Sequence, residues 1–272
     1  MRSLNGKELS GFIKERQAHE VRSLRQAHGI TPKLAIIQCK DDPVINTYVR
    51  LKKQYGADIL IDVDIYVIPQ SEIAKLLQKL NKADSIHGII VQLPLTDTSQ
   101  TEEIVSKVAP EKDVDALGNN AEFEPATPMA ILWLLAGYNV DLRGKKILLL
   151  GRGKLVGKPL ERMLMSEGHD VQTAGRDVKD LSSVTKQADI IISATGNPGI
   201  LRSNMIKENS VVVDAGTASE SGKVVGDVAP EVYERDDLTI TPVKGGVGPL
   251  TVCALFENTI RAARRAADAK VV

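Results

Sequence analysis

Cysteine is scarce in this chain, which has 272 residues and two cysteines, Cys39 and Cys253. Two cysteines cannot make the disulfide framework of a small secreted protein, so we expect a reducing cytoplasm. Both stand among apolar residues and are expected to be small, buried side chains. A chain of this length buries a large core without disulfide or metal staples, and it corresponds to about two domains.

Long apolar runs and an excess of one charge are absent too. The run from Ala130 to Ala136 spans seven residues, against ~18 for a membrane helix. The first residues, Met1 to Lys7, lack the apolar stretch of a signal peptide. Lysine and arginine (35) balance aspartate and glutamate (35), and the four histidines show no metal-ligand spacing. We therefore expect no membrane association, no nucleic-acid partner and no metal.

Apolar runs and helical patterns alternate along the chain, as in parallel α/β proteins. In the first half the expected strands are 34–37, 63–68 and 88–92, with helices at 8–28, 43–56 and 71–83. A second series has strands at 146–150, 170–174, 190–194, 211–214 and 239–242, and a last helix at 250–267. We predict two α/β domains, the second a Rossmann-like doubly wound parallel sheet. The helix at 129–137 marks the junction, so residues 1–137 and 250–272 form one domain and residues 138–249 the other.

A glycine-rich turn follows the expected strand at 146–150. Gly151, Gly153 and Gly157 are spaced G-x-G-x-x-x-G, and Pro159 stands where a helix begins. In a strand–turn–helix unit, glycines let the backbone approach a pyrophosphate, and free N–H groups at the helix start point at it. The spacing is one residue longer than the usual dinucleotide fingerprint, and by itself it also fits a tight structural turn. In this context it predicts a nucleotide site.

The next strand indicates which dinucleotide binds. It ends at Gly175-Arg176, where folds of this kind meet the adenosine ribose. An acidic residue there favours NAD, whereas guanidinium groups such as those of Arg176 and Arg152 match the additional phosphate of NADP. Asp177 stands next to Arg176 and weakens this preference. We expect NADP to be the cofactor.

Candidate substrate-binding groups lie in the first half of the chain. Tyr48 and Lys52 are four residues apart on one face of an expected helix, a pair able to stack on an aromatic substrate and to move protons. Gln92 closes a buried strand, at the edge where parallel sheets bind ligands. Asp113 and Asp115 are expected on one side of an extended segment, where one buried carboxylate binds an amino-heterocycle.

In combination, these segments resemble the bifunctional methylenetetrahydrofolate dehydrogenase/cyclohydrolase family. The matching segments are Tyr48-Val49-Arg50-Leu51-Lys52, Val91-Gln92-Leu93-Pro94-Leu95, Lys112-Asp113-Val114-Asp115, Gly151-Arg152-Gly153-Lys154-Leu155-Val156-Gly157-Lys158-Pro159 and Gly245-Gly246-Val247-Gly248-Pro249-Leu250-Thr251. The last of these is expected to begin as a loop, with glycines that admit close approach of a ligand. The resemblance runs from about residue 32 to residue 259, nearly the whole chain.

The resemblance implies a folate cleft between two domains and two successive reactions. Methylenetetrahydrofolate is oxidised to the methenyl cation with NADP, and the cation is hydrolysed to formyltetrahydrofolate. It also implies a homodimer joined through the cofactor domains. By motif it implies that Lys52 is the catalytic lysine, with Gln92 as its hydrogen-bonding partner and a catalytic role for Tyr48 as well. It also implies substrate binding by Tyr48, Asp115, Gly246 and Pro249, and cofactor binding by Gly151, Arg152, Gly153, Arg176 and Thr217.

Two other functions compete with this one. A shikimate-dehydrogenase-like NADP enzyme also uses a lysine and an aspartate in a cleft, but the segments around Gln92 and from Gly245 to Thr251 argue against it. A catalytically idle nucleotide-binding protein is the second alternative, and the presence of Lys52, Gln92 and Asp115 argues against that. Substrate-dependent formation of NADPH settles the choice between the two enzymes, and cofactor binding without turnover would favour the idle protein.

Overall fold

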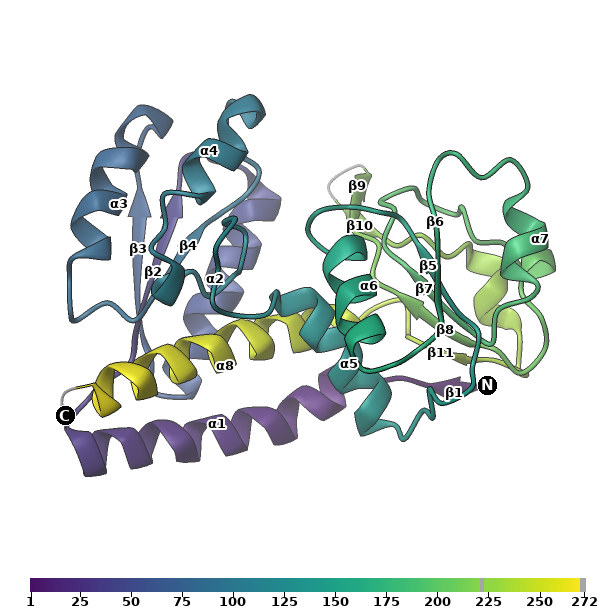
Figure 1. The fold of residues 1–272 in the computed structure, drawn as a ribbon, viewed down its shortest axis with the longest axis horizontal. Coiled ribbons are helices and arrows are strands. Elements are labelled where there is room, and N and C mark those ends of the chain that lie inside the picture. The colour runs from purple at the N-terminus through teal and green to yellow at the C-terminus, as the bar shows by residue number, and fades with distance from the viewer. Residues whose placement is uncertain (221–222, 270–272) are drawn as a thin grey trace. The chain divides into compact units, whose positions relative to one another are not determined.

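The computed structural model describes residues 1–220 and 223–269, and backbone contacts divide the chain into two compact units. The six-stranded unit comprises Met1–Ser10 and Thr127–Thr251, and the three-stranded unit comprises Gly11–Ala126 and Val252–Val272. Each is an α/β layer structure (Figure 1). Within the described residues, no helix combines the length and the apolar character needed to cross a membrane.

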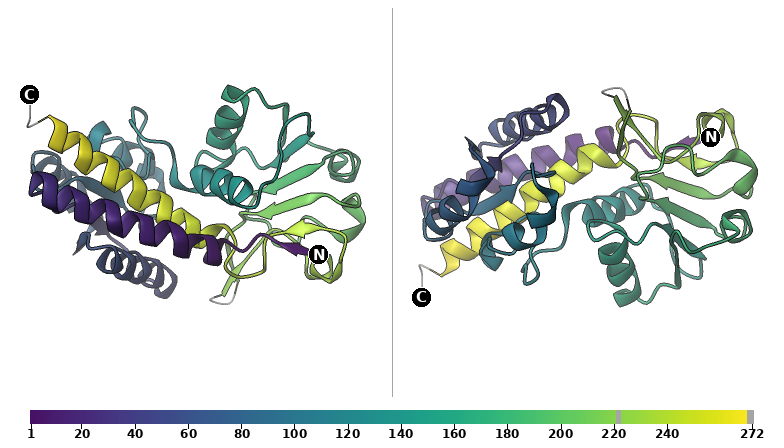
Figure 2. Two further views of the ribbon diagram at one scale, coloured as in Figure 1. Left: turned by 90° about the horizontal axis from the view of Figure 1, so that it is seen from below. Right: turned by 90° about the horizontal axis from the view of Figure 1, so that it is seen from above.

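The three-stranded unit is built on a short parallel sheet in the order β3-β2-β4, formed by β2 (Lys33–Gln38), β3 (Asp62–Val67) and β4 (Gly88–Val91). Its strands β2 and β4 are almost wholly buried, as their continuous apolar sequences require. The helices that surround it are α1 (Gly6–His28), α2 (Pro43–Asp58), α3 (Ile73–Asn81), α4 (Thr101–Val105) and α8 (Val247–Asp268). Figure 2 shows α1 and α8 side by side, and Arg16 Nη2 of α1 lies 2.7 Å from Glu257 Oε2 of α8.

The six-stranded unit contains a fully parallel sheet in the order β1-β11-β8-β7-β5-β6. Its strands are β1 (Arg2–Ser3), β5 (Ile147–Leu150), β6 (Val171–Ala174), β7 (Ile190–Ser193), β8 (Val211–Asp214) and β11 (Thr239–Ile240). The helices of this unit are α5 (Ala126–Gly137), α6 (Gly157–Ser166) and α7 (Leu181–Thr185). A separate antiparallel pair is formed by β9 (Ala218–Glu220) and β10 (Lys223–Val225). The central strands β5 and β7 are buried at every position.

The predicted fold class, two α/β domains with a parallel sheet in the second, is confirmed. Several element boundaries differ from the prediction, most clearly two helix starts: α5 begins at Ala126 rather than at residue 129, and α8 begins at Val247 rather than at residue 250. Gly248 and Pro249 therefore lie in the first turn of this helix and not in a loop, because proline needs no N–H partner there. Of the two free cysteines, Cys253 is buried as expected, but Cys39 is only partly buried.

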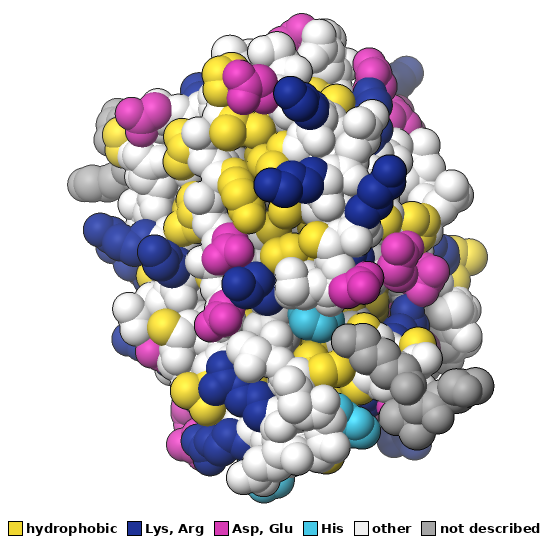
Figure 3. Space-filling view, turned by 90° about the vertical axis from the view of Figure 1, so that its left-hand side faces the viewer, with side chains coloured by type: hydrophobic (Ala, Val, Ile, Leu, Met, Phe, Trp, Pro, Cys, Tyr) yellow, Lys and Arg dark blue, Asp and Glu magenta, His cyan; other side chains and the backbone are white. Residues whose placement is uncertain are grey.

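One face of the three-stranded unit displays charged side chains of both signs. Figure 3 shows this end of the molecule, where Lys and Arg side chains alternate with Asp and Glu around a stretch of hydrophobic side chains. Such a surface has no extended field of one sign.

Candidate active site

Helix α2 presents Tyr48 and Lys52 on one side. Asp42 caps the helix, with its carboxylate accepting from the backbone N–H of Val44 at 2.9 Å, and Pro43 occupies the first turn. The apolar side chains of Ile45 and Val49 on this helix are buried. Tyr48 and Lys52 lie one helical turn apart, and both are half-buried. The predicted helix and the shared face of these two residues are confirmed.

Lys52 is joined to the end of strand β4. Its Nζ donates to Oε1 of Gln92 at 2.8 Å, and Nε2 of Gln92 donates to the carbonyl of Leu93 at 2.9 Å. The second bond fixes which end of the amide faces the lysine. Burial lowers the pKa of Lys52, and the nearby charge of Asp115 partly raises it again. The structure thus brings together two residues that are 40 positions apart in sequence.

Asp113 and Asp115 have different environments. Asp113 lies beside Ile89 of β4 and is 3% exposed, and its carboxylate accepts from the backbone N–H of Gly118 at 2.7 Å. Burial raises the pKa of Asp113 to about 6. Burial also raises the pKa of Asp115, while the charge of Lys52 lowers it. Of these two carboxylates, Asp115 is the one whose charge influences the pKa of Lys52.

The expectation that both carboxylates lie on one side of an extended segment was wrong. The chain turns after Asp113, where the N–H of Ala116 donates to the carbonyl of Asp113 at 3.1 Å and Ala116 has a φ of 54°. The carboxylate of Asp113 is used inside this turn, where it accepts from the backbone N–H groups of Leu117 and Gly118. The turn itself is anchored by the preceding lysine, because Nζ of Lys112 donates to the carbonyls of Asn81 at 2.8 Å and Ala83 at 2.9 Å.

The glycine-rich turn of the six-stranded unit lies between β5 and α6. Gly151 has a φ of 101°, and a Cβ there would lie 2.6 Å from the carbonyl oxygen of Ala194. A Cβ on Gly157 would lie 2.0 Å from the carbonyl oxygen of Gly151. Gly153, in contrast, faces open space. Only glycine fits the first two positions, and the turn leads directly into the N-terminus of α6, which is the geometry that accepts a dinucleotide phosphate.

Arg152 crosses from this turn to the end of β6. Its Nη2 donates to the carbonyl of Thr173 at 3.0 Å, and its Nη1 lies 3.7 Å from Oδ2 of Asp177. Arg176 is exposed at the same strand end. The structure therefore brings the two arginines predicted for the 2′-phosphate of NADP to one edge of the sheet, together with an acidic neighbour. These residues fit an NADP adenosine ribose.

Two further carboxylates, which the sequence analysis missed, shape the carboxyl edge of this sheet. Asp227 is fully buried and accepts from Oγ of Ser193 and from the N–H of Thr195, each at 2.6 Å. Asp214 accepts from the N–H groups of Gly216 at 2.9 Å and of Asp227 at 3.0 Å. Burial and the charge of Asp227 raise the pKa of Asp214. These bonds fix the backbone after β7 and β8, where the α/β fold binds its ligand.

The remaining predicted site residues also lie in the six-stranded unit. Thr217 is exposed in the segment that follows β8. Gly246 is buried, and its carbonyl oxygen approaches the start of α1, where a Cβ on Gly6 would lie 1.9 Å from it. Pro249 is partly buried in the first turn of α8. No signal in the sequence alone separates the packing role of Gly246 from the substrate-binding role predicted for it.

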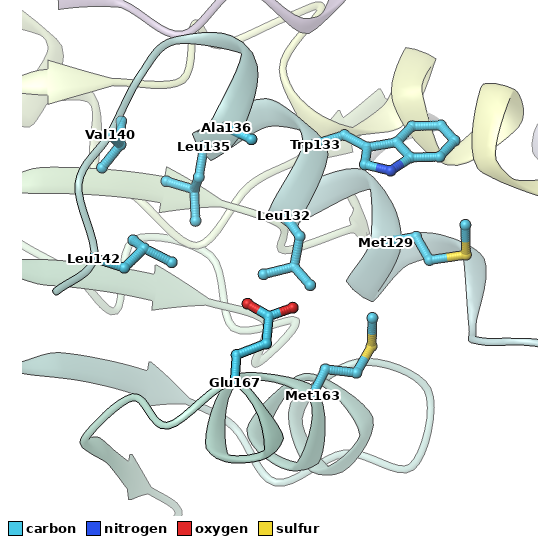
Figure 4. A pocket seen from close by; sticks show the side chains of 9 residues that line it. All are labelled: Met129, Leu132, Trp133, Leu135, Ala136, Val140, Leu142, Met163 and Glu167. Atoms are coloured by element: carbon cyan, nitrogen blue, oxygen red, sulfur yellow. The ribbon is translucent and has the colours of Figure 1, made fainter.

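The six-stranded unit also contains a cavity that the sequence did not predict. It measures about 300 Å³, and Figure 4 shows its side chains projecting from α5, α6 and the segments after them. The nine lining residues are Met129, Leu132, Trp133, Leu135, Ala136, Val140, Leu142, Met163 and Glu167. Glu167 is the charged member of this set. None of the predicted site residues lines the cavity.

Comparison with known proteins agrees with the geometry of both units. Residues 4–115 match the family described as tetrahydrofolate dehydrogenase/cyclohydrolase, catalytic domain, and residues 125–267 match its NAD(P)-binding domain. The bifunctional protein FolD of Campylobacter jejuni (strain RM1221) is 40% identical over 279 residues, which cover 97% of this chain and 99% of the relative.

Solved structures give the same result. The crystal structure of the bifunctional enzyme FolD, methylenetetrahydrofolate dehydrogenase/cyclohydrolase, from Campylobacter jejuni has 40% identity and a TM-score of 0.90, covering 97% of this chain and 99% of that one. The Trypanosoma brucei N5,N10-methylenetetrahydrofolate dehydrogenase-cyclohydrolase, solved with NADP cofactor and an inhibitor, has 31% identity and a TM-score of 0.90, covering 97% of both chains. The present chain therefore belongs to the tetrahydrofolate dehydrogenase/cyclohydrolase family.

Proposed function

We propose that this protein oxidises methylenetetrahydrofolate to methenyltetrahydrofolate with NADP and hydrolyses the methenyl form to formyltetrahydrofolate. The family match over both units supports this assignment. The observation that carries it is the half-buried pair of Lys52 and Gln92, joined at 2.8 Å, with the charge of Asp115 acting on the lysine. The family match also argues against the shikimate-dehydrogenase-like alternative.

Lys52 is the proposed acid–base group of the hydrolytic step. An amine handles protons near neutral pH only if part of it is uncharged, and burial moves the pKa of Lys52 in that direction. Gln92 accepts its hydrogen bond through a neutral amide oxygen, so the amine is oriented without the strong preference for the charged form that a carboxylate partner imposes. The cationic methenyl substrate adds to the same effect, because a nearby positive charge disfavours the ammonium form.

Tyr48 and Asp115 are proposed to hold the folate. Tyr48 lies one helical turn before Lys52 and is half-buried, so its ring is available on the lysine's side of α2. Backbone N–H groups act on the carboxylate of Asp113, whereas burial and the charge of Lys52 are what act on Asp115. The carboxylate of Asp115 is proposed to accept paired hydrogen bonds from an amino-heterocycle. Gly246 and Pro249 are proposed as further substrate contacts on the strength of the resemblance alone.

Gly151, Arg152, Gly153, Arg176 and Thr217 are the residues proposed to hold NADP. The absent side chains of Gly151 and Gly157 leave the backbone open for a pyrophosphate at the start of α6. Arg152 and Arg176 supply guanidinium groups at the end of β6. When bound, NADP accepts a hydride from the methylene carbon, and the protein's part in that step is mainly to position the two reactants.

We propose the following division of labour within the chain. Residues 1–137 and 250–272 bind folate and residues 138–249 bind NADP, since Lys52, Gln92 and Asp115 fall in the first set and Gly151 and Arg176 in the second. The two compact units are defined by backbone contacts, and they differ from this division because residues 1–10, 127–137 and 250–251 fall in the same unit as residues 138–249.

A homodimer and a cytoplasmic setting complete the proposal. The resemblance supports the homodimer, and in the described part of the chain the β9–β10 pair is joined by no third strand, which leaves strand edges open. Both cysteines are free thiols, which agrees with a reducing compartment. Light scattering of the purified protein at several concentrations tests the dimer.

The decisive experiment is a spectrophotometric assay with methylenetetrahydrofolate and each nicotinamide cofactor. It follows the reduced cofactor and the methenyl intermediate at the same time. We expect substrate-dependent formation of NADPH and transient or absent accumulation of the methenyl form. Cofactor binding without any turnover would instead favour a catalytically idle nucleotide-binding protein.

A further inference from the structure

The carboxylate of Asp177 lies over the end of β6 and faces Arg152. A Cβ built on Gly175 would lie 2.6 Å from Oδ1 of Asp177 and 3.7 Å from Cδ of Arg152, so both side chains turn back over the same residue. Nη1 of Arg152 lies 3.7 Å from Oδ2 of Asp177. The absence of a side chain at Gly175 provides the space that the carboxylate occupies.

This position is the one where dinucleotide-binding sheets distinguish their ligands. A carboxylate at the end of the second strand accepts a hydrogen bond from the 2′-hydroxyl of NAD, whereas an arginine there accommodates the 2′-phosphate of NADP. The present chain has both kinds of group at one strand end. The guanidinium groups of Arg152 and Arg176 suit a 2′-phosphate, and the carboxylate of Asp177 suits a 2′-hydroxyl. The ion pair between Arg152 and Asp177 places them in direct competition.

We propose that Asp177 is a specificity-determining residue that opposes the two arginines. It competes with the 2′-phosphate of NADP for Arg152 and offers an acceptor to the 2′-hydroxyl of NAD. The proposal rests on the assignment of Arg152 and Arg176 to the 2′-phosphate. Its consequence is that the enzyme uses both dinucleotides, with a preference for NADP smaller than the two arginines alone provide.

The size of the effect follows from exposure. The side chains of Arg152 and Asp177 are 53% and 69% exposed, so solvent screens their interaction. From the strength of exposed ion pairs, removal of the Asp177 charge is expected to raise the ratio of NADP affinity to NAD affinity by about two- to fivefold. Because screening grows with ionic strength, the improvement in NADP affinity is expected to shrink in high salt.

Asp177→Asn tests the proposal, with Asp170→Asn as its matched control. Asp170 is an exposed carboxylate just before β6, at the opposite end of the same strand, and its removal changes the net charge equally. Calorimetric titration of the full chain with NADP and with NAD gives the affinity ratio, and titration with adenosine 2′,5′-bisphosphate and with AMP probes the ribose end alone. We expect the ratio to rise for both ligand pairs in Asp177→Asn and to stay unchanged in Asp170→Asn. A ratio that falls, or that moves no further than in the control, overturns the proposal.

Arg152→Ala separates this proposal from the assignment on which it rests. If Arg152 holds the 2′-phosphate, the variant loses NADP preference, and adding Asp177→Asn to it changes the ratio less than it does in the wild type. If Arg152→Ala loses the preference but Asp177→Asn has no effect in the wild type, the role of Asp177 is wrong and that of Arg152 stands. If Arg152→Ala keeps the full preference, the assignment of Arg152 itself is wrong.

Discussion

Asp113 gives the most quantitative prediction. The residue is 3% exposed, and burial raises the pKa of its carboxyl from an ordinary value of 3.8 to about 6. One pKa unit corresponds to about 1.4 kcal/mol, so ionised Asp113 lowers the free energy of unfolding by about 3 kcal/mol relative to the protonated form.

The sign follows from proton binding. Between pH 3.8 and about 6 the folded protein keeps a proton on Asp113 that the unfolded chain releases. The folded state therefore binds more protons in this window, and the contribution of Asp113 to stability falls as the pH rises. The contribution is fully present below pH 3.8 and is lost above pH 6. This is opposite to the effect of Asp141 and Asp237, whose pKa values are lowered to about 2 by arginine partners.

Asp113→Asn removes the titration while keeping the shape of the side chain. The free energy of unfolding of each protein is measured by urea unfolding with circular dichroism. We expect the difference, wild type minus variant, to decline by about 3 kcal/mol as the pH rises from 3.8 to about 6. Asp62→Asn, which removes an exposed carboxylate of the same unit, is the control and is expected to show no such decline. A difference that stays constant, or grows with pH, refutes the argument that burial dominates at Asp113.

The remaining predictions concern activity. Lys52→Ala should lose most cyclohydrolase activity and keep its fold and NADP binding; near-normal hydrolysis of added methenyltetrahydrofolate contradicts the assignment. Gln92→Glu should raise the pKa of Lys52 and move the acid limb of the cyclohydrolase pH profile to higher pH, and an unmoved limb means that the amide does not set the state of the amine. Asp115→Asn should move that limb to lower pH, because the charge of Asp115 raises the pKa of Lys52, and should weaken folate binding by ~1.5–3 kcal/mol; unchanged values for both show that another residue holds the pterin. Arg152→Ala combined with Arg176→Ala should raise the Michaelis constant for NADP by about ten- to one-hundredfold per arginine relative to NAD, and retained NADP preference rules these residues out.

The main elements of the fold were predictable because their residues are buried on both faces. Continuous apolar runs such as Ile147–Leu150 and Gly88–Val91 identify central parallel strands without any further information. Strands of two or three residues, such as β1 and the β9–β10 pair, are too short for a periodic pattern and were missed. The start of α8 was misplaced because Gly248 and Pro249 favour a loop in most contexts, whereas the first helical turn tolerates both.

The candidate site was predictable by residue type but not by contact. The pairing of Lys52 with Gln92 is the exception, because the resemblance implied it and the hydrogen bond between them confirms it. The different roles of Asp113 and Asp115 depend on a turn with positive φ at Ala116, which no spacing rule indicates for alanine. The pairing of Arg152 with Asp177 likewise depends on how a glycine at 175 lets both side chains fold back. The functional roles themselves stay predictions until the variants are assayed.

The surroundings of Lys52 show how one lysine is suited to both binding and proton transfer. Burial favours the neutral amine and lowers the pKa of Lys52, while the charge of Asp115 favours the ammonium and opposes this effect. A carboxylate in place of Gln92, at the same 2.8 Å, would add a second negative charge and hold the lysine protonated. The neutral amide instead fixes the position of Nζ and leaves its protonation to respond to the substrate. In the proposed hydrolysis, the cationic methenyl group would further disfavour the ammonium form. The neutral amine is the form that could take a proton from the attacking water, and conversion to the uncharged formyl product would remove this influence.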